Sequence, residues 1–219
     1  MNWIETSYPK WVLQHRWYII FFSLVFVILA ASGARLLNFT TSYRVFFSED
    51  NPQLLAFEAL ENTYVRNDNV LIVFEPKDGN VFSKEVLSLV KEITEKAWQI
   101  PYSNRVDSIT NFQYTEAEED DLTVRDLVTG AKKLSAQELR KVREIAMAEP
   151  LLVHRLISDR GHVTAINVTV QLPRINEMVE TPEVVTYVRN LADEIRESHP
   201  DVNVYLTGMI MMNNSFSEC

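Results

Sequence analysis

The residue types that most often carry out chemistry are few in this chain, and their spacing forms no site. The four histidines are far apart, and none pair with the spacing of a zinc site. They are His15, His154, His162 and His199. The only cysteine, Cys219, is the last residue, so the chain can form neither an internal disulfide nor a cysteine-based metal site. Motifs for a nucleophile elbow, a phosphate loop or a dinucleotide fold do not occur. We therefore predict no enzyme, no catalytic residue, no metal and no cofactor.

Acidic residues are numerous, but they do not form a cation site in the sequence. The run EAEEDD over residues 116–121 lacks the alternating ligands and central glycine of a calcium loop, so we predict a solvated loop there. The whole chain has 30 acidic and 21 basic residues, a formal charge of −9. This balance argues against nucleic acid as a partner.

The longest apolar stretch is WYIIFFSLVFVILAASGARLL, residues 17–37, and it has no charged side chain before Arg35. Such a run is typical of a transmembrane helix. A cleaved secretory signal is the alternative, because small residues occupy 30–34, although a signal core is usually shorter. We predict a cytoplasmic tail over 1–16, a transmembrane helix over 17–37 in the inner membrane, and a periplasmic location for everything after residue 37. The lipid bilayer is then a partner.

A connector and a helix follow over residues 38–69. Phe46 and Phe47 form an aromatic pair, and Asp50 and Asn51 offer an N-cap directly before Pro52, which is tolerated at the first helical position. Apolar residues at helical spacing predict a helix from residue 52 to about 65.

The pattern over residues 70–207 predicts one α+β domain. We expect a buried strand over 70–75, a helix over 83–99 capped by Ser83, and a strand over 106–112. We then expect strands over 151–157 and 163–172 joined by a turn at 158–161, a helix over 182–198 with Thr181 as cap and Pro182 first, and a strand over 202–207. In the strand 163–172 the alternation predicts one core face and one wet or partner-facing face. This order is that of a ferredoxin-like, split βαβ domain.

Two further segments complete the predicted organisation. The insertion 113–150 is expected to be helical, with a short helix over 124–128 and a capping box formed by Ser135 and Glu138. Residues 208–219, with Met209, Ile210 and Phe216, read as the start of a truncated second membrane segment.

Three segments that follow the apolar span carry a family resemblance. They are SYRVFFSEDNPQLLAFEALENTYVRNDNVLIVFEPKDGNVFS, PLLVHRLISDRGHVTAINVTVQLP and YLTGMIMMNNSFSE. In this order they resemble the N-terminal part of an RND-superfamily exporter of the MMPL type. The resemblance implies a proton-driven membrane transporter whose first helix precedes a periplasmic, ferredoxin-like porter domain. It also implies two partners, the rest of the transporter chain and a hydrophobic or amphipathic, lipid-like substrate. A homo-oligomer is left open.

On this interpretation Phe46, Phe47 and Pro52 couple the apolar span to the porter domain, although packing alone would also explain the aromatic pair. A membrane-anchored binding or sensing module outside the cytoplasm is an alternative function. An enzyme released by signal cleavage is a third.

Overall fold

The computed structural model describes residues 8–33, 47–48, 50–63, 68–118, 121–173 and 175–218. The chain separates into two compact units, Met1–Thr40 and Thr41–Cys219. The two are described one after the other.

The first unit contains two helices, α2 (Tyr8–Gln14) and α3 (Arg16–Ser32). The 17 residues of α3 extend about 26 Å at 1.5 Å per residue, less than the roughly 30 Å of a hydrocarbon core. Over the described ranges, no helix combines the length and the apolar character that crossing a membrane requires. The predicted transmembrane helix over 17–37 is therefore wrong, and the inner-membrane anchor based on it is not supported. Residues 34–37 lie outside the described ranges.

The second unit begins with α4 (Pro52–Thr63), which has the predicted start. The Asn51 side-chain oxygen accepts hydrogen bonds from the backbone amides of Gln53 and Leu54, at 2.9 and 3.1 Å. Asn51 is therefore the N-cap, and Pro52 takes the first helical position, where its missing N–H costs no hydrogen bond.

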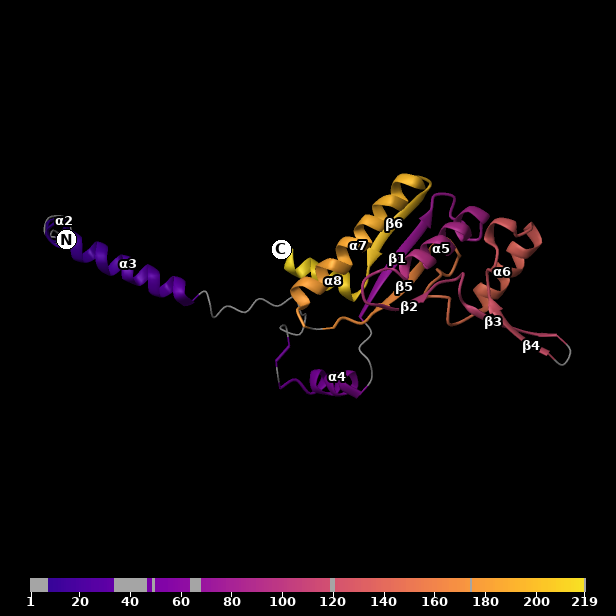
Figure 1. Cartoon of the computed structure of the whole chain (residues 1–219), viewed down its shortest axis with the longest axis horizontal. Helices are drawn as coiled ribbons and strands as arrows, with labels where there is room; N and C mark the ends of the chain where they lie inside the picture. Colours follow the sequence, from indigo (N-terminus) through magenta and orange to yellow (C-terminus); the bar gives the residue numbers. More distant parts are fainter. Residues whose placement is uncertain are drawn as a thin grey trace. The chain divides into compact units, whose positions relative to one another are not determined.

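A four-stranded antiparallel sheet organises the rest of this unit, as Figure 1 shows. Its strands are β1 (Asp68–Pro76), β2 (Ser103–Asp107), β5 (Thr164–Val170) and β6 (Val202–Thr207). Helix α5 (Lys84–Ala97) connects β1 to β2, and helix α7 (Glu177–Ser198) connects β5 to β6. The spatial order β2-β5-β1-β6 interleaves these two strand-helix-strand units, so the domain is α+β.

The core lies between the sheet and these two helices, which cover the same face (Figure 1). Alternate residues of the strands are fully buried there, as are one stripe of α5 and one of α7. The predicted alternation in β5 is confirmed, because Ile166, Val168 and Val170 are 0% exposed while Asn167 and Thr169 between them are only half-buried.

The insertion differs from its prediction, because it contains a β-hairpin before its helix. Strands β3 (Gln113–Glu118) and β4 (Asp121–Asp126) pair antiparallel and extend away from the sheet (Figure 1). The solvated loop predicted at 116–121 is therefore wrong over 116–118 and at 121, while residues 119–120 lie outside the described ranges. The short helix predicted at 124–128 is also wrong. A short 3₁₀ turn, η3 (Ala131–Lys133), leads to α6 (Ala136–Ala148), where the predicted capping box of Ser135 and Glu138 is confirmed.

Two strand predictions fail for local reasons. Strand β2 ends at Asp107, because the Ser108 amide donates to the Asn111 side chain at 2.7 Å and the Asn111 amide nitrogen donates to the Val106 carbonyl. Residues 151–157 form tight turns, with only isolated bridges at Val153 and Ile157. The following turn is present, since the Gly161 amide donates to the Ser158 carbonyl at 2.9 Å.

The start of α7 and the segment after β6 also differ in detail from their predictions. Helix α7 begins at Glu177, five residues before the predicted start, so Thr181 is not its cap and Pro182 lies inside it. The buried Glu180 carboxylate holds this start by accepting from the Ile175 and Asn176 amides, at 2.9 and 3.0 Å. After β6 the chain turns at Gly208 into a nine-residue helix, α8 (Met209–Ser217).

Candidate functional site

The sheet face opposite α5 and α7 carries polar and half-exposed side chains. Strand pairing aligns Asp107, Asn167 and Leu71 in one row across β2, β5 and β1. The next row contains Arg105, Thr169 and Asn69. We call this surface the open face. The strands alternate, so these positions face away from the core that their neighbours fill.

A turn segment, residues 151–157, forms a wall at one side of the open face. Backbone hydrogen bonds close it on itself, including His154 to the Ile157 carbonyl at 2.8 Å and Leu156 to the Leu152 carbonyl at 2.8 Å. His154 has a φ of +63°, a left-handed conformation that non-glycine residues adopt rarely. The Leu156 carbonyl accepts from the Ala165 amide at 2.8 Å, which fastens the segment to β5. The wall is therefore held by backbone geometry.

Between the open face and this wall lies a groove with a cavity volume of about 490 Å³. Its lining combines the open face, the turn after β2 and the wall segment. The lining residues are Asn69, Leu71, Arg105, Asp107, Ser108, Asn111, Phe112, Leu151, Leu152, Arg155, Leu156 and Asn167. This volume lies within the range of sites that hold small molecules, as does the mixture of apolar walls with a few polar groups.

The charges in the groove do not balance. Arg105 Nε donates to Asp107 Oδ1 at 2.8 Å, so these two charges compensate each other. Arg155 is exposed, and within the described part of the chain its guanidinium has no ion-pair partner. The described lining residues thus carry one excess positive charge in a chain whose formal charge is −9.

Two asparagines on the floor of the groove have defined orientations. The Met209 backbone amide donates to Asn69 Oδ1 at 3.2 Å, which identifies that atom as the acceptor. Asn69 Nδ2 must then be the donor, and it donates to Asn167 Oδ1 at 2.8 Å. The remaining group, the Asn167 Nδ2 amide, has no partner in the described ranges. Its donor hydrogens are free for a ligand.

The serine among the described lining residues of the groove is held in a cluster of hydroxyl groups. Ser108 is 1% exposed, and its hydroxyl is held between those of Thr94 and Thr110, at 2.9 and 2.8 Å. Across the described residues, no three histidine, cysteine, aspartate or glutamate side chains are close enough to hold a metal ion. The arrangement is therefore suited to binding.

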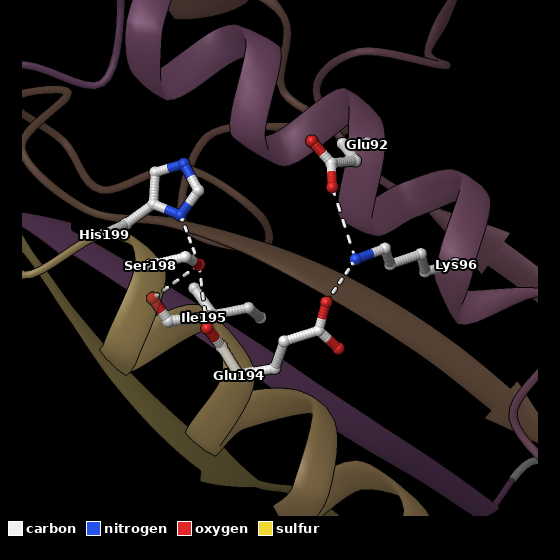
Figure 2. A network of polar contacts seen from close by, with 6 residues as sticks. All are labelled: Glu92, Lys96, Glu194, Ile195, Ser198 and His199. Atoms are coloured by element: carbon white, nitrogen blue, oxygen red, sulfur yellow. Dashed lines mark hydrogen bonds and ion pairs between the residues drawn. The ribbon is translucent and has the colours of Figure 1, made fainter.

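Two serine-histidine contacts occur outside the groove, and both are local. Ser158 Oγ lies 2.8 Å from His162 Nδ1, but it also accepts from the His162 and Val163 amides, so it closes the turn. Ser198 Oγ lies 2.9 Å from the ring of the adjacent His199 at the end of α7, as Figure 2 shows. Neither serine is poised as a nucleophile.

The same view shows how the two covering helices are linked. Lys96 of α5 donates to Glu194 of α7 at 2.7 Å and lies 3.3 Å from Glu92 of its own helix (Figure 2). The bond to Glu194 raises the pKa of Lys96, and Glu92 adds to this effect. The site is exposed, so this link contributes little to stability.

The residues predicted to couple the apolar span to the domain do not meet in the groove. Phe46 lies outside the described residues. Phe47 is 49% exposed, and Pro52, the first residue of α4, is exposed as well. Neither Phe47 nor Pro52 lines the groove.

Sequence reasoning missed Arg105 and Arg155. Both follow from local structure that was predicted wrongly, since β2 was expected to begin at residue 106 and residues 151–157 were expected to form a strand. The alternation in β5 was the available signal, because it indicated a wet or partner-facing side that includes Asn167 and Thr169.

No family model matches the chain, and a search of curated proteins finds no match either.

Proposed function

We propose that the chain is part of an RND-type exporter of the MMPL type, and that residues 70–207 form its porter domain outside the cytoplasm. The observation that supports this best is the sheet with two different faces. One face is sealed by α5 and α7, while the other presents a preformed groove with apolar walls. A domain of this kind can contact a hydrophobic or amphipathic substrate without losing its own core.

On this proposal the domain works mechanically and carries out no chemistry. Proton flow through the rest of the transporter drives domain movement, and the groove alternately meets and releases substrate. Phe46, Phe47 and Pro52 are proposed to transmit the movement to the domain.

The proposal is tested by deleting the native gene and measuring how well cells retain a lipophilic fluorescent dye. We expect the deletion strain to retain more dye, the intact gene to restore export, and a protonophore to abolish the difference. Equal retention with and without the gene, at verified expression, would refute the exporter. In the same assay, a Phe46→Ala and Phe47→Ala double variant with undiminished export would remove the coupling role alone.

The groove itself favours a second candidate, a binding or sensing module outside the cytoplasm. A preformed wall and free hydrogen-bond donors suit a receptor site as well as they suit a transport path. Reading the gene beyond codon 219 separates the two. Continuation into several apolar segments that contain Asp or Glu favours the exporter, because acids inside a membrane are costly and usually functional. A stop codon favours the module.

A further inference from the structure

We propose that the groove of the open face binds an anionic amphiphile, with its charged head at Arg155 and Asn167 and its apolar part along the leucines of the wall. This inference deepens the proposed function, on which it rests, by naming the chemical class of the molecule that the domain contacts.

The charge of the head group follows from the donors. Arg155 contributes a guanidinium without an ion-pair partner in the described chain, and Asn167 Nδ2 contributes an amide whose hydrogens are free. Among the described lining residues, Asp107 carries the only side-chain carboxylate, and Arg105 already compensates it. Donors in excess of acceptors select an anion, and a guanidinium binds carboxylate or phosphate oxygens especially well.

The Asn167 donor and the backbone that carries Arg155 are held in place before any ligand arrives. The Met209 amide orients Asn69, and Asn69 in turn orients Asn167, so the free Nδ2 cannot exchange places with the oxygen without losing a hydrogen bond. Arg155 follows the left-handed turn at His154, and its own amide donates to the Leu152 carbonyl at 3.2 Å. Preorganised donors reduce the entropic cost of binding.

The apolar part of the ligand follows from the rest of the lining. Leu71 forms the floor, while Leu151 and Leu156 form the wall, and Leu151 is 57% exposed. The lining therefore combines unpaired donors with an exposed apolar side chain. A free inorganic anion would leave that apolar side chain unused.

The binding experiment uses the full 219-residue chain with isotope-labelled asparagine, at an ionic strength of about 0.15 M. The probes are octanoate, octyl phosphate and uncharged octanol, and the readout is the side-chain amide signals of Asn69 and Asn167. We expect saturable shifts with at least one of the two anions below about 1 mM. Whichever anion binds more tightly identifies the head group. No saturation with either anion, or equal affinity for octanol, would overturn the proposal.

Matched variants locate the binding. Arg155→Gln and Asn167→Asp should each weaken binding of the anion about tenfold or more, since each removes a donor and the second adds a repelling charge. Arg160→Gln, an exposed arginine in the turn after the wall, and Gln99→Glu, after α5, should leave the affinity unchanged. If the control variants weaken binding as much as the groove variants, the attraction is general and the proposal fails.

This test is independent of the exporter assay. If the chain binds octanoate but the gene confers no export activity, the exporter is refuted and the binding site stands. If the gene confers export but the groove does not bind these anions, the binding proposal is refuted and the exporter stands.

Discussion

The two faces of the sheet are built from alternating residues of the same strands, and they have opposite roles. Under α5 and α7, the side chains of Val70, Ile72 and Phe74 are fully buried. On the open face, their neighbours Leu71 and Val73 are half-buried and stand among polar groups. One strand thus supplies part of the core on one side and part of the groove lining on the other. Tolerance to substitution should differ accordingly.

The largest difference is expected between adjacent positions of β1. Ile72→Ala should lower the free energy of unfolding by about 3 kcal/mol, because it leaves a cavity in a closed core. Leu71→Ala should lower it by about 1 kcal/mol, because water and neighbouring side chains can occupy the space. Urea unfolding of both variants measures the difference. Equal losses would mean that the open face is as structural as the core.

The residue after β6, Gly208, should not tolerate substitution, because its backbone lies close to that of Asn69. Gly208 has φ +111° and ψ 171°, and a Cβ there would lie 2.5 Å from the Asn69 carbonyl oxygen. We expect Gly208→Ala to cost about 2 kcal/mol or more, because both conformation and space favour glycine. Gly130→Ala, where a Cβ would meet nothing within 4 Å, is the control for thermal unfolding and should cost far less.

A smaller effect is expected from the polar cluster at the edge of the core. Thr94 Oγ1 donates to Ser108 Oγ at 2.9 Å, so Thr94→Val removes a buried hydrogen bond and should cost about 1 kcal/mol. The same change on the open face, Thr169→Val, should stay within about 0.5 kcal/mol. Urea unfolding would contradict the comparison if Thr169→Val proved the more damaging.

The smallest expected effect is the pH dependence of an ion pair that lies on neither face of the sheet. Arg189 of α7 donates to both carboxylate oxygens of Glu218, at 2.6 and 2.9 Å, and this lowers the pKa of Glu218 from 4.5 to about 2. Because the folded pKa is the lower one, the contact contributes fully above pH 4.5 and is lost as pH falls through about 2. Carboxyl NMR titration should give a midpoint near 2, and Arg189→Gln should move it upward. Arg160→Gln should leave it unchanged.

Local signals were sufficient to predict much of the sheet and its helices from the sequence. Strand β6 matches its predicted range, and the caps at Asn51, Ser83 and Ser135 are confirmed, because each uses a side chain within three residues of the amide that it binds. The alternation in β5 likewise needs only the period of a strand.

Two other failures occur where a contact lies beyond the three-residue reach of a cap. The acidic hairpin β3 and β4 depends on pairing between two polar segments, and the start of α7 depends on the Glu180 carboxylate reaching back to Ile175. The 17–37 prediction is wrong because α3 has 17 residues, and no described helix combines the length and apolar character that crossing a membrane requires.

Composition and periodicity alone determined an acidic α+β chain with a strand that is buried on one side. Only tertiary structure brought Arg155 from a turn, Asn167 from β5 and Asn69 from β1 to the same groove. The reason is that these residues are up to 98 positions apart, and their relation is set by strand register and by a turn closed through its own backbone. No local pattern in the sequence contains that information.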